Sequence, residues 1–337
     1  MKQFWETLCG EWQLGAPTRT PQPVSGGYMH KMYRLDTPCG CYAVKLLNPE
    51  VMSRPTALAN YRKAEMLECV LEENGLPIVA ALCRDGRKMH RIGEQYYYLF
   101  PWVPYQVLPE TAVTPEHCAV IGGLLAQMHS LPCGEIAIAA QQPQAFTFDW
   151  ETIAKDIQRE CSTSETTLAE TLSAHLELLN TAQNAYRRAV EALPPLMGIC
   201  NADMDAKNVL WQENEPLIID LECLEIGNPV NDLVQLSLSW SGGASGMIDE
   251  RCLSAFLAAY RKIHPLPSLD WDAVSGLGFS WLDWLHYNLR RACGRTVDTQ
   301  EERSLGIRQA QETLEKIRRY AGVQSRTAAQ FRQFMHK

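Results

Sequence analysis

The sequence predicts an α+β fold in two parts, a small antiparallel β-sheet with one helix followed by a larger, mainly helical part. Over the first hundred residues, β-rich runs and turn signals surround a single helical stretch. After Pro101 and Pro104 the apolar positions recur mostly at helical spacing. We therefore expect an N-terminal lobe over 1–101, a hinge over 102–106 and a helical C-terminal lobe over 107–337.

The elements of the N-terminal lobe follow from local signals. The runs SGGYMHKMYRLDT and GCYAVKLLN are β-rich, and Pro38-Cys39-Gly40 between them is a turn signal, which together predict a hairpin. Residues 55–74 carry apolar side chains at helical spacing, and Asn74-Gly75 predicts the end of that helix. The run QYYYLFPWVPY supplies the last strand.

The C-terminal lobe begins with a clear helix start. Thr114-Pro115-Glu116 offers a cap, a proline in the first turn and an acid near the helix N-terminus. Amphipathic stretches follow over 150–193 and from 230 to the end. The interruption at 194–229 carries short β-type runs with polar residues at fixed offsets, so we expect the chemistry there.

Composition excludes several classes of protein. The 31 basic and 39 acidic residues give a net charge of −8, which disfavours a nucleic-acid-binding surface. No apolar run approaches the roughly 18–20 residues that span a bilayer. Glu6 and Glu11 interrupt the start of the chain where a secretory signal is apolar, and the twelve cysteines are dispersed. We expect a cytoplasmic protein with no nucleic-acid or membrane partner.

The insert reads GICNADMDAKNVLWQENEPLIIDLECLEIGNPVND. Asp203 and Asn208 are five positions apart, and Asp220 ends the run LIID twelve positions later. Phosphoryl transfer needs a carboxylate that orients and deprotonates the attacking hydroxyl, and amide and carboxylate oxygens on Mg²⁺. Asp203 fits the catalytic role, and Asn208 and Asp220 fit the metal. A hairpin would bring the loop and the strand end together.

Here the chain resembles a known family. NADMDAKNVLW followed by IIDLE is similar to the catalytic loop and metal-binding segment of aminoglycoside phosphotransferases and their choline-kinase-like relatives. In the downstream GNPVNDL, Asp232 would brace that loop. The resemblance implies a bilobal protein-kinase-like fold, Mg²⁺, and transfer of the γ-phosphate of ATP or GTP to a hydroxyl. It favours an amino-bearing, aminoglycoside-type substrate.

The resemblance also implies a nucleotide site in the N-terminal half. Glycines in VSGGYMHKMYRL would let backbone amides approach phosphates, and YAVKLLN would place a phosphate-binding lysine on the next strand. This lysine needs an acidic partner on the following helix, which is Glu65 or, as the alternative, Glu68. FPWVPY would be the hinge on which adenine rests. The expected nucleotide-site residues are Gly26, Gly27, Lys45, Glu65, Phe100 and Trp102.

The sequence departs from the family pattern at two positions. Asn201 stands where members usually carry His, and since Asn keeps a donor and an acceptor we expect the loop geometry to be retained. Asp205 lies between the base and the metal ligand, where its charge would repel a phosphate unless it is paired, with Lys207 as the nearest candidate. These departures put rate and substrate in question more than nucleotide binding.

Substrate residues are suggested in two regions. Asp205 and Glu222 flank the predicted metal site, and Asp283 and Trp284 lie in WLDWLHYNLRRA, where an acid beside aromatic rings would suit a cationic substrate. For the second region, a core helix that uses tryptophan for bulk is the more common explanation of such a pattern.

Alternative functions are a choline-, ethanolamine- or homoserine-type kinase and a regulatory pseudokinase, the latter motivated by Asn201 and Asp205. A protein kinase is disfavoured because little chain separates Asp220 from GNPVND. The acceptor, the choice of ATP or GTP and the oligomeric state stay open.

Overall fold

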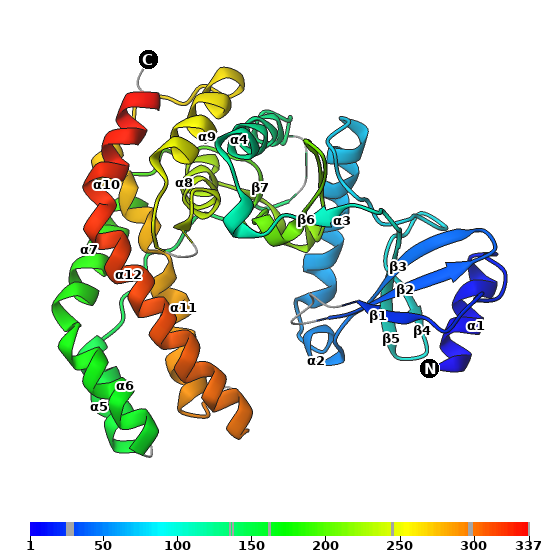
Figure 1. Cartoon of the computed structure of the whole chain (residues 1–337), viewed down its shortest axis with the longest axis horizontal. Coiled ribbons are helices and arrows are strands. Elements are labelled where there is room, and N and C mark those ends of the chain that lie inside the picture. The colour runs from blue at the N-terminus through cyan, green and yellow to red at the C-terminus, as the bar shows by residue number, and fades with distance from the viewer. Residues whose placement is uncertain are drawn as a thin grey trace. The chain divides into compact units, whose positions relative to one another are not determined.

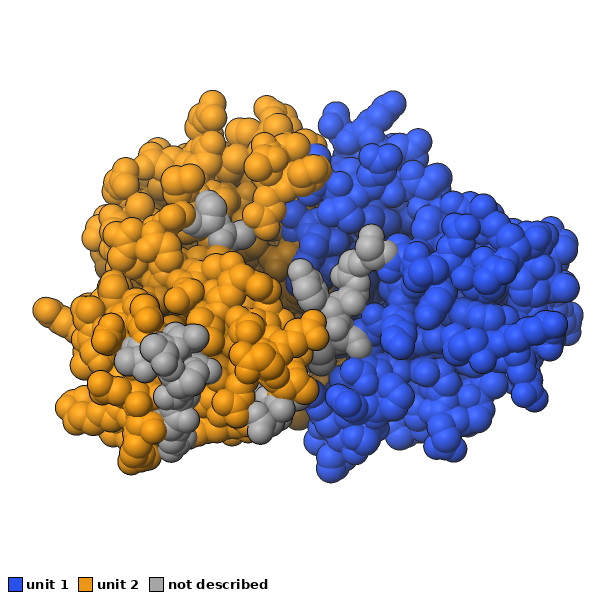
Figure 2. All heavy atoms as spheres, turned by 60° about the horizontal axis from the view of Figure 1, so that its bottom comes forward, with its two compact units in different colours: residues 1–108, 206–225 blue, residues 109–205, 226–337 orange. Residues whose placement is uncertain are grey.

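The chain forms two compact units, which Figure 2 shows in blue and orange. The computed structural model describes residues 1–24, 30–134, 136, 138–160, 163–243, 246–295 and 299–335. Unit 1 comprises 1–108 and 206–225, and unit 2 comprises 109–205 and 226–337. The predicted hinge at 102–106 stays a prediction.

Residues 206–225 belong to unit 1, although the sequence suggested the helical lobe for the whole insert. The cause is backbone pairing with the segment that follows the long helix of unit 1. The amide of Ile218 donates to the carbonyl of Pro77 at 2.8 Å, and the amide of Val79 donates to the carbonyl of Ile218 at 2.9 Å. The insert therefore supplies strands to the unit that carries Lys45.

Unit 1 contains two antiparallel sheets. One has the strand order β1-β2-β3-β5-β4 and the other the order β6-β8-β9. Its helices and strands are α1 (Lys2–Glu11), β1 (Gln22–Val24), β2 (Lys31–Thr37), β3 (Gly40–Leu46), α2 (Pro49–Met52), α3 (Ala57–Glu73), β4 (His90–Ile92), β5 (Gln95–Pro101), β6 (Gln106–Val107), η2 (Ala206–Asn208), β8 (Val209–Gln212), β9 (Glu215–Ile218) and η3 (Leu221–Cys223).

The two faces of the larger sheet are covered by different helices, because side chains alternate along a strand. Val44 and Leu99 lie in a buried cluster with residues of α1. Tyr98 lies in a second cluster with Tyr61 of α3, and Lys45 is paired with Tyr98 in the β3–β5 register. Lys45 therefore lies on the sheet face that is covered by α3.

The predicted elements of this unit are present, and the structure adds others, of which helix α1 is the longest. The β2–β3 hairpin turns at Pro38-Cys39, with Thr37 opposite Gly40, and α3 ends at Glu73, ahead of Asn74 and Gly75. Helix α1 was not predicted. It buries Trp5, Leu8 and Cys9 against the sheet, at the spacing of one helix face.

Unit 2 is mainly helical. Its elements are η1 (Glu110–Ala112), α4 (Pro115–His129), α5 (Trp150–Glu160), α6 (Thr163–Ala174), α7 (Leu176–Glu191), β7 (Gly198–Asn201), the second half of β10 (Leu224–Gly227), α8 (Pro229–Trp240), α9 (Glu250–Ile263), α10 (Trp271–Val274), η5 (Ser275–Phe279), α11 (Trp281–Ala292) and α12 (Gln300–Met335). β7 and β10 are paired, and α11 lies beside α12 (Figure 1). The antiparallel sheet and the helical remainder confirm the predicted α+β class.

Local chemistry sets the start and the packing of the first long helix of this unit. The Thr114 hydroxyl accepts a hydrogen bond from the amide of His117, which confirms the predicted cap of α4. Gly122 allows α4 to approach α9 closely, since a Cβ there would lie 2.4 Å from the carbonyl oxygen of Phe256. Within the described ranges, each helix is too short or too polar to cross a lipid bilayer.

Candidate active site

The β8–β9 hairpin makes neighbours of two predicted metal ligands. Val209 pairs with Ile218, and the carbonyl of Asn208 accepts a hydrogen bond from the amide of Ile219 at 2.9 Å. Asp220 follows with φ 59° and ψ 62°, a left-handed conformation that Asp tolerates better than most residues. The twelve-residue spacing is thus the length of the hairpin that brings Asn208 next to the end of β9.

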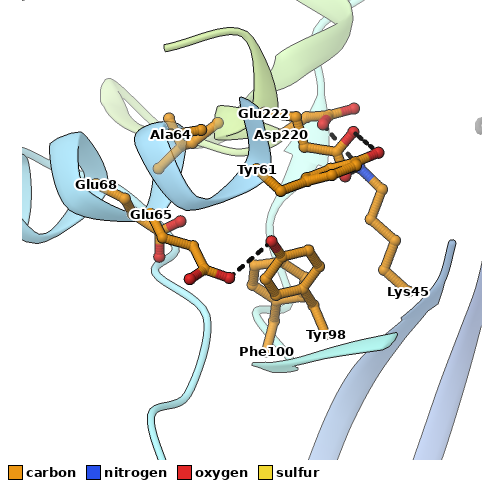
Figure 3. Close-up of a pocket in the computed structure, with 10 residues that line it drawn as sticks. Lys45, Tyr61, Ala64, Glu65, Glu68, Tyr98, Phe100, Asp220 and Glu222 are labelled. Carbon is orange, nitrogen blue, oxygen red and sulfur yellow. Dashed lines mark hydrogen bonds and ion pairs between the residues drawn. The ribbon is translucent and has the colours of Figure 1, made fainter. Parts of the chain in front are cut away.

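Lys45 lies in an acidic setting in the same unit. Its ammonium group is 2.8 Å from Oδ1 of Asp220 and 2.6 Å from Oε1 of Glu222, and its side chain is only 8% exposed (Figure 3). Burial alone would lower the pKa of Lys45, but the charges of Glu222 and Asp220 outweigh it, so the pKa is raised. The lysine therefore stays cationic, as its predicted role in phosphate binding requires.

Glu222 is held on both of its oxygens. Its Oε2 lies 3.2 Å from Nε2 of His30 and 3.4 Å from the hydroxyl of Tyr61. Burial raises the pKa of Glu222, but the hydrogen bond from His30 and the charge of Lys45 outweigh that effect and lower it. Glu222 is thus an ionised partner of Lys45.

The structure corrects the expected partner of Lys45. Glu65 accepts hydrogen bonds from the hydroxyl of Tyr98 at 2.9 Å and from the amide of Met89 at 3.0 Å (Figure 3). Tyr98 is the cross-strand neighbour of Lys45, so it meets the carboxylate that we expected the lysine to bind. The partners of Lys45 in the structure are instead Asp220 and Glu222.

The alternative partner, Glu68, is also hydrogen-bonded to other groups. The carboxylate of Glu68 accepts hydrogen bonds from Lys88 at 2.8 Å and from the amide of Ala81 at 2.7 Å. Glu68 therefore ties α3 to the segment that leads into β4.

A small pocket lies between α3, the sheet and η3. Its lining residues are Lys45, Tyr61, Ala64, Glu65, Glu68, Tyr98, Phe100, Asp220, Leu221 and Glu222. The enclosed volume is about 20 Å³, enough for about one water molecule and far below that of a nucleotide. This pocket is therefore the packed region around the Lys45 ammonium, and Phe100 forms part of its wall.

The remaining residues predicted for the nucleotide lie elsewhere or outside the description. The amide of Trp102 donates to the carbonyl of Cys41 at 3.0 Å, which extends the β3–β5 pairing, and the guanidinium of Arg34 lies 4.8 Å from the centre of its ring. Gly26 and Gly27 lie outside the described residues.

In unit 2, the loop that carries Asp203 is tied down by side chains. Asp232 accepts hydrogen bonds from the amide of Asn201 at 3.0 Å and shares a 3.1 Å contact with Nε2 of His129. Oδ1 of Asn201 accepts from the amide of Asp203 at 3.3 Å. Asp232 is thus placed to brace the loop, and Asn201 keeps an orienting bond to Asp203.

The carboxylate of Asp205 has a neutral partner in the same unit. Its Oδ1 accepts a hydrogen bond from the hydroxyl of Ser239 on α8 at 2.5 Å, and the indole of Trp240 donates to the carbonyl of Met204 at 2.8 Å. Two consecutive residues of α8 therefore fix this end of the loop.

On α11, the predicted substrate residues lie on the exposed side. Trp284 and Tyr287 are both partly exposed and stack with ring centres 5.2 Å apart, at 16° between the ring planes. Asp283 is also exposed. Burial, and to a smaller extent the charge of Asp283, raises the pKa of Tyr186 on α7 to about 12. The buried positions of the helix are instead Leu282, Leu285, Asn288, Leu289 and Ala292.

The donor set in unit 1 fits a magnesium ion. Mg²⁺ prefers oxygen ligands, and the side chain of Asp220 keeps 38% of its surface exposed. Oε1 of Glu222 is not part of this set, because it already faces the Lys45 ammonium at 2.6 Å.

The fold and these residues together define a kinase-like phosphotransferase. Among solved structures, a spectinomycin phosphotransferase in complex with ADP and spectinomycin is similar over 97% of both chains, with a TM-score of 0.67 and 15% identity. A choline/ethanolamine kinase family protein from Mesorhizobium loti is similar over 98% of both chains (TM-score 0.60, 16% identity). A microcompartment-associated aminopropanol kinase is similar over 95% of this chain and 98% of the other (TM-score 0.56, 16% identity).

The sequence itself gives the family. Residues 20–266 match the phosphotransferase enzyme family, so the chain belongs to that family. A comparison with curated protein sequences finds no match.

Sequence reasoning missed two residues of the Lys45 network, His30 and Tyr61. Tyr61 was identified only as an apolar position of a helix, and His30 as part of a β-rich run. Neither residue carries a local signal for its contact with Glu222, because that contact joins positions far apart in the chain.

Proposed function

We propose that this phosphotransferase carries the γ-phosphate of ATP or GTP to a hydroxyl of an amino-bearing small molecule, with an aminoglycoside-type acceptor favoured. The observation that carries the proposal is the buried Lys45 ammonium, 2.8 Å from the Asp220 carboxylate at the end of a hairpin that begins with Asn208. The chemistry matches a triphosphate held by a cation beside a metal-binding carboxylate. A cytoplasmic location, where ATP is supplied, is part of the proposal.

Each residue has a distinct task in this proposal. Lys45 binds the phosphates, and Asn208 and Asp220 hold Mg²⁺, which neutralises charge on the triphosphate when bound. Asp203 orients the acceptor hydroxyl and takes its proton. The bonds of Asn201 and Asp232 support this role, because a general base must be held in one place.

The acceptor half of the proposal concerns α11 and Asp205. The stacked rings of Trp284 and Tyr287 beside exposed Asp283 suit a cationic amino group. The carboxylate of Asp205 accepts a hydrogen bond from Ser239, and Asp205 stays a candidate for acceptor binding. Glu222, which was also predicted to contact substrate, has contacts that support a place beside Lys45 instead.

The test is transfer of labelled phosphate. Purified protein is incubated with Mg²⁺ and γ-labelled ATP or GTP across aminoglycosides, choline, ethanolamine, homoserine and sugar amines. We expect labelled product with one acceptor class and a fall of about 10²–10⁴-fold in kcat for Asp203→Asn. Absence of transfer to the whole panel, or unchanged kcat in Asp203→Asn, contradicts the proposal.

A metabolite kinase is the second candidate. It is supported by the similarity to the choline/ethanolamine kinase family protein and to the aminopropanol kinase. Transfer to choline or ethanolamine, with none to aminoglycosides, would select it. Nucleotide binding with no transfer would instead favour the pseudokinase alternative.

A further inference from the structure

The ammonium group of Lys45 needs a fixed partner, because a flexible four-carbon side chain does not hold a charge in one position by itself. In many kinases a helix carboxylate serves this purpose. Here the two α3 carboxylates of the pocket are bound by other groups, Glu65 by Tyr98 and Glu68 by Lys88. The partner must come from Asp220 or Glu222.

The surroundings of the two acids favour Glu222. Asp220 is the more exposed carboxylate, and it is the proposed metal ligand. Glu222 is 22% exposed and divides its oxygens between two sides, with Oε1 toward Lys45 and Oε2 toward His30 and Tyr61. Because the contacts of Oε2 fix the side chain of Glu222, its Oε1 can keep the Lys45 ammonium in one position.

The tautomer of His30 follows from its other contact. The backbone amide of Asn48 donates to Nδ1 of His30 at 3.0 Å. A backbone amide can only donate, so Nδ1 carries no proton and the proton of the neutral ring is on Nε2. That N–H group lies 3.2 Å from Oε2 of Glu222. A backbone group on the stretch between β3 and α2 thus fixes the direction in which His30 donates.

Tyr61 completes the support. Its hydroxyl lies 3.1 Å from Nε2 of His30 and donates to Oε2 of Glu222 at 3.4 Å. Figure 3 shows the hydroxyl of this tyrosine directed at the carboxylate of Glu222. His30 directly precedes β2, Tyr61 lies on α3 and Glu222 lies on η3, so the contacts join separate elements of unit 1.

We propose that Glu222, held by His30 and Tyr61, is the residue that positions Lys45 for the nucleotide phosphates. This inference rests on the proposed kinase function and adds the partner that fixes Lys45 and the residues that hold that partner. Glu222 and His30 are positioning residues, since they act through Lys45. The role predicts an effect on phosphate binding that does not depend on a metal.

The test measures ADP affinity by calorimetry in EDTA, which removes any contribution that a residue makes through a bound metal. A carboxylate that was merely near the phosphates would repel them, so its removal would tighten ADP binding. A positioning residue does the opposite. We expect Glu222→Gln to weaken ADP binding about 10-fold or more, the scale of one hydrogen bond between charged groups. Unchanged or tighter binding overturns the proposal.

Matched variants separate positioning from damage to the fold. Glu72→Gln removes a carboxylate of α3 that lies outside the pocket, and this variant should bind ADP as the wild type does. In a Lys45→Met background, Glu222→Gln should cause no further loss, because its effect passes through the lysine. A further loss there, or an equal loss in Glu65→Gln, overturns the role of Glu222.

Variants of His30 test the support itself. His30→Phe keeps a ring but loses both nitrogens, and we expect weaker ADP binding; His30→Gln returns a donor and should recover part of the affinity. Normal affinity in His30→Phe overturns the role of His30. If the wild type binds ADP and the variants do not differ, only this inference fails, whereas a wild type that binds no nucleotide removes the proposed function as well.

Discussion

The buried ion pair between Lys88 and Glu68 gives the sharpest prediction about the fold around Lys45. Both side chains are nearly inaccessible, at 6% and 8% exposure, and their charged atoms are 2.8 Å apart. Removing one partner of such a pair leaves a charge buried and uncompensated, at a cost of about 3–5 kcal/mol. Because the amide of Ala81 still donates to Glu68, we expect the lower end, about 3 kcal/mol, for Lys88→Met.

Urea unfolding followed by circular dichroism measures this cost. The matched control is Glu72→Gln, which removes the other acid near Lys88, 3.2 Å away and 56% exposed, and should cost at most about 1 kcal/mol. Adding Glu68→Gln to Lys88→Met should recover part of the loss, since it removes the stranded charge. A cost for Lys88→Met no larger than that of Glu72→Gln would refute the structural role given to Glu68.

Two further predictions concern other parts of the chain. Gly122→Ala should destabilise the protein by about 1–3 kcal/mol, because its Cβ would meet the carbonyl of Phe256. The control Gly322→Ala has open space around it and should raise stability by about 0.5–1 kcal/mol. Equal effects of the two substitutions in thermal unfolding would contradict the close α4–α9 contact. The pKa of Asp36 is held well below its ordinary value, chiefly by the hydrogen bond from Arg19 and then by Cys41 and Arg34. A carboxyl group with a lowered pKa in the folded state stabilises the protein at pH values above its unfolded pKa of about 3.9, and this stabilisation is lost as the pH falls. The stability advantage of the wild type over Asp36→Asn should therefore shrink between pH 6 and pH 3. A constant difference in the free energy of unfolding over this range would contradict the ion-pair role of Asp36.

Much of the fold was predictable because its signals are local. The turn at Pro38-Cys39-Gly40, the end of α3 at Asn74-Gly75 and the cap at Thr114 each depend on a few consecutive residues. Helix α1 also had a local signal, the spacing of Trp5, Leu8 and Cys9. A helical-periodicity count over the first twelve residues would have found it.

The candidate site divides in the same way. The neighbouring positions of Asn208 and Asp220 follow from a short hairpin and were predictable from spacing. The partner of Lys45 was not, because it depends on competition between side chains. The hydroxyl of Tyr98 and the amide of Met89 bind Glu65 in the folded chain, and no pattern in the sequence indicates their proximity.

Residue roles in the loop show a third case. Asn201 departs from the family pattern, and the sequence could only suggest that its amide would replace one function of the usual histidine. In the structure, the amide of Asp203 donates a hydrogen bond to Oδ1 of Asn201, so the amide side chain does contact the loop. Ser239 as a partner of Asp205 lay beyond sequence reasoning, since 34 residues separate them.

The central claim is that Asn208 and Asp220 hold the metal of a bound nucleoside triphosphate. Crystals grown with Mn²⁺ and a non-hydrolysable ATP analogue test it through the anomalous signal of the metal. The account predicts an ion with the side-chain oxygen of Asn208 and a carboxylate oxygen of Asp220 at roughly 2.1 Å, bridged to phosphate oxygens. An ion bound to phosphates with neither residue in contact, or a nucleotide seated away from Lys45, would contradict it.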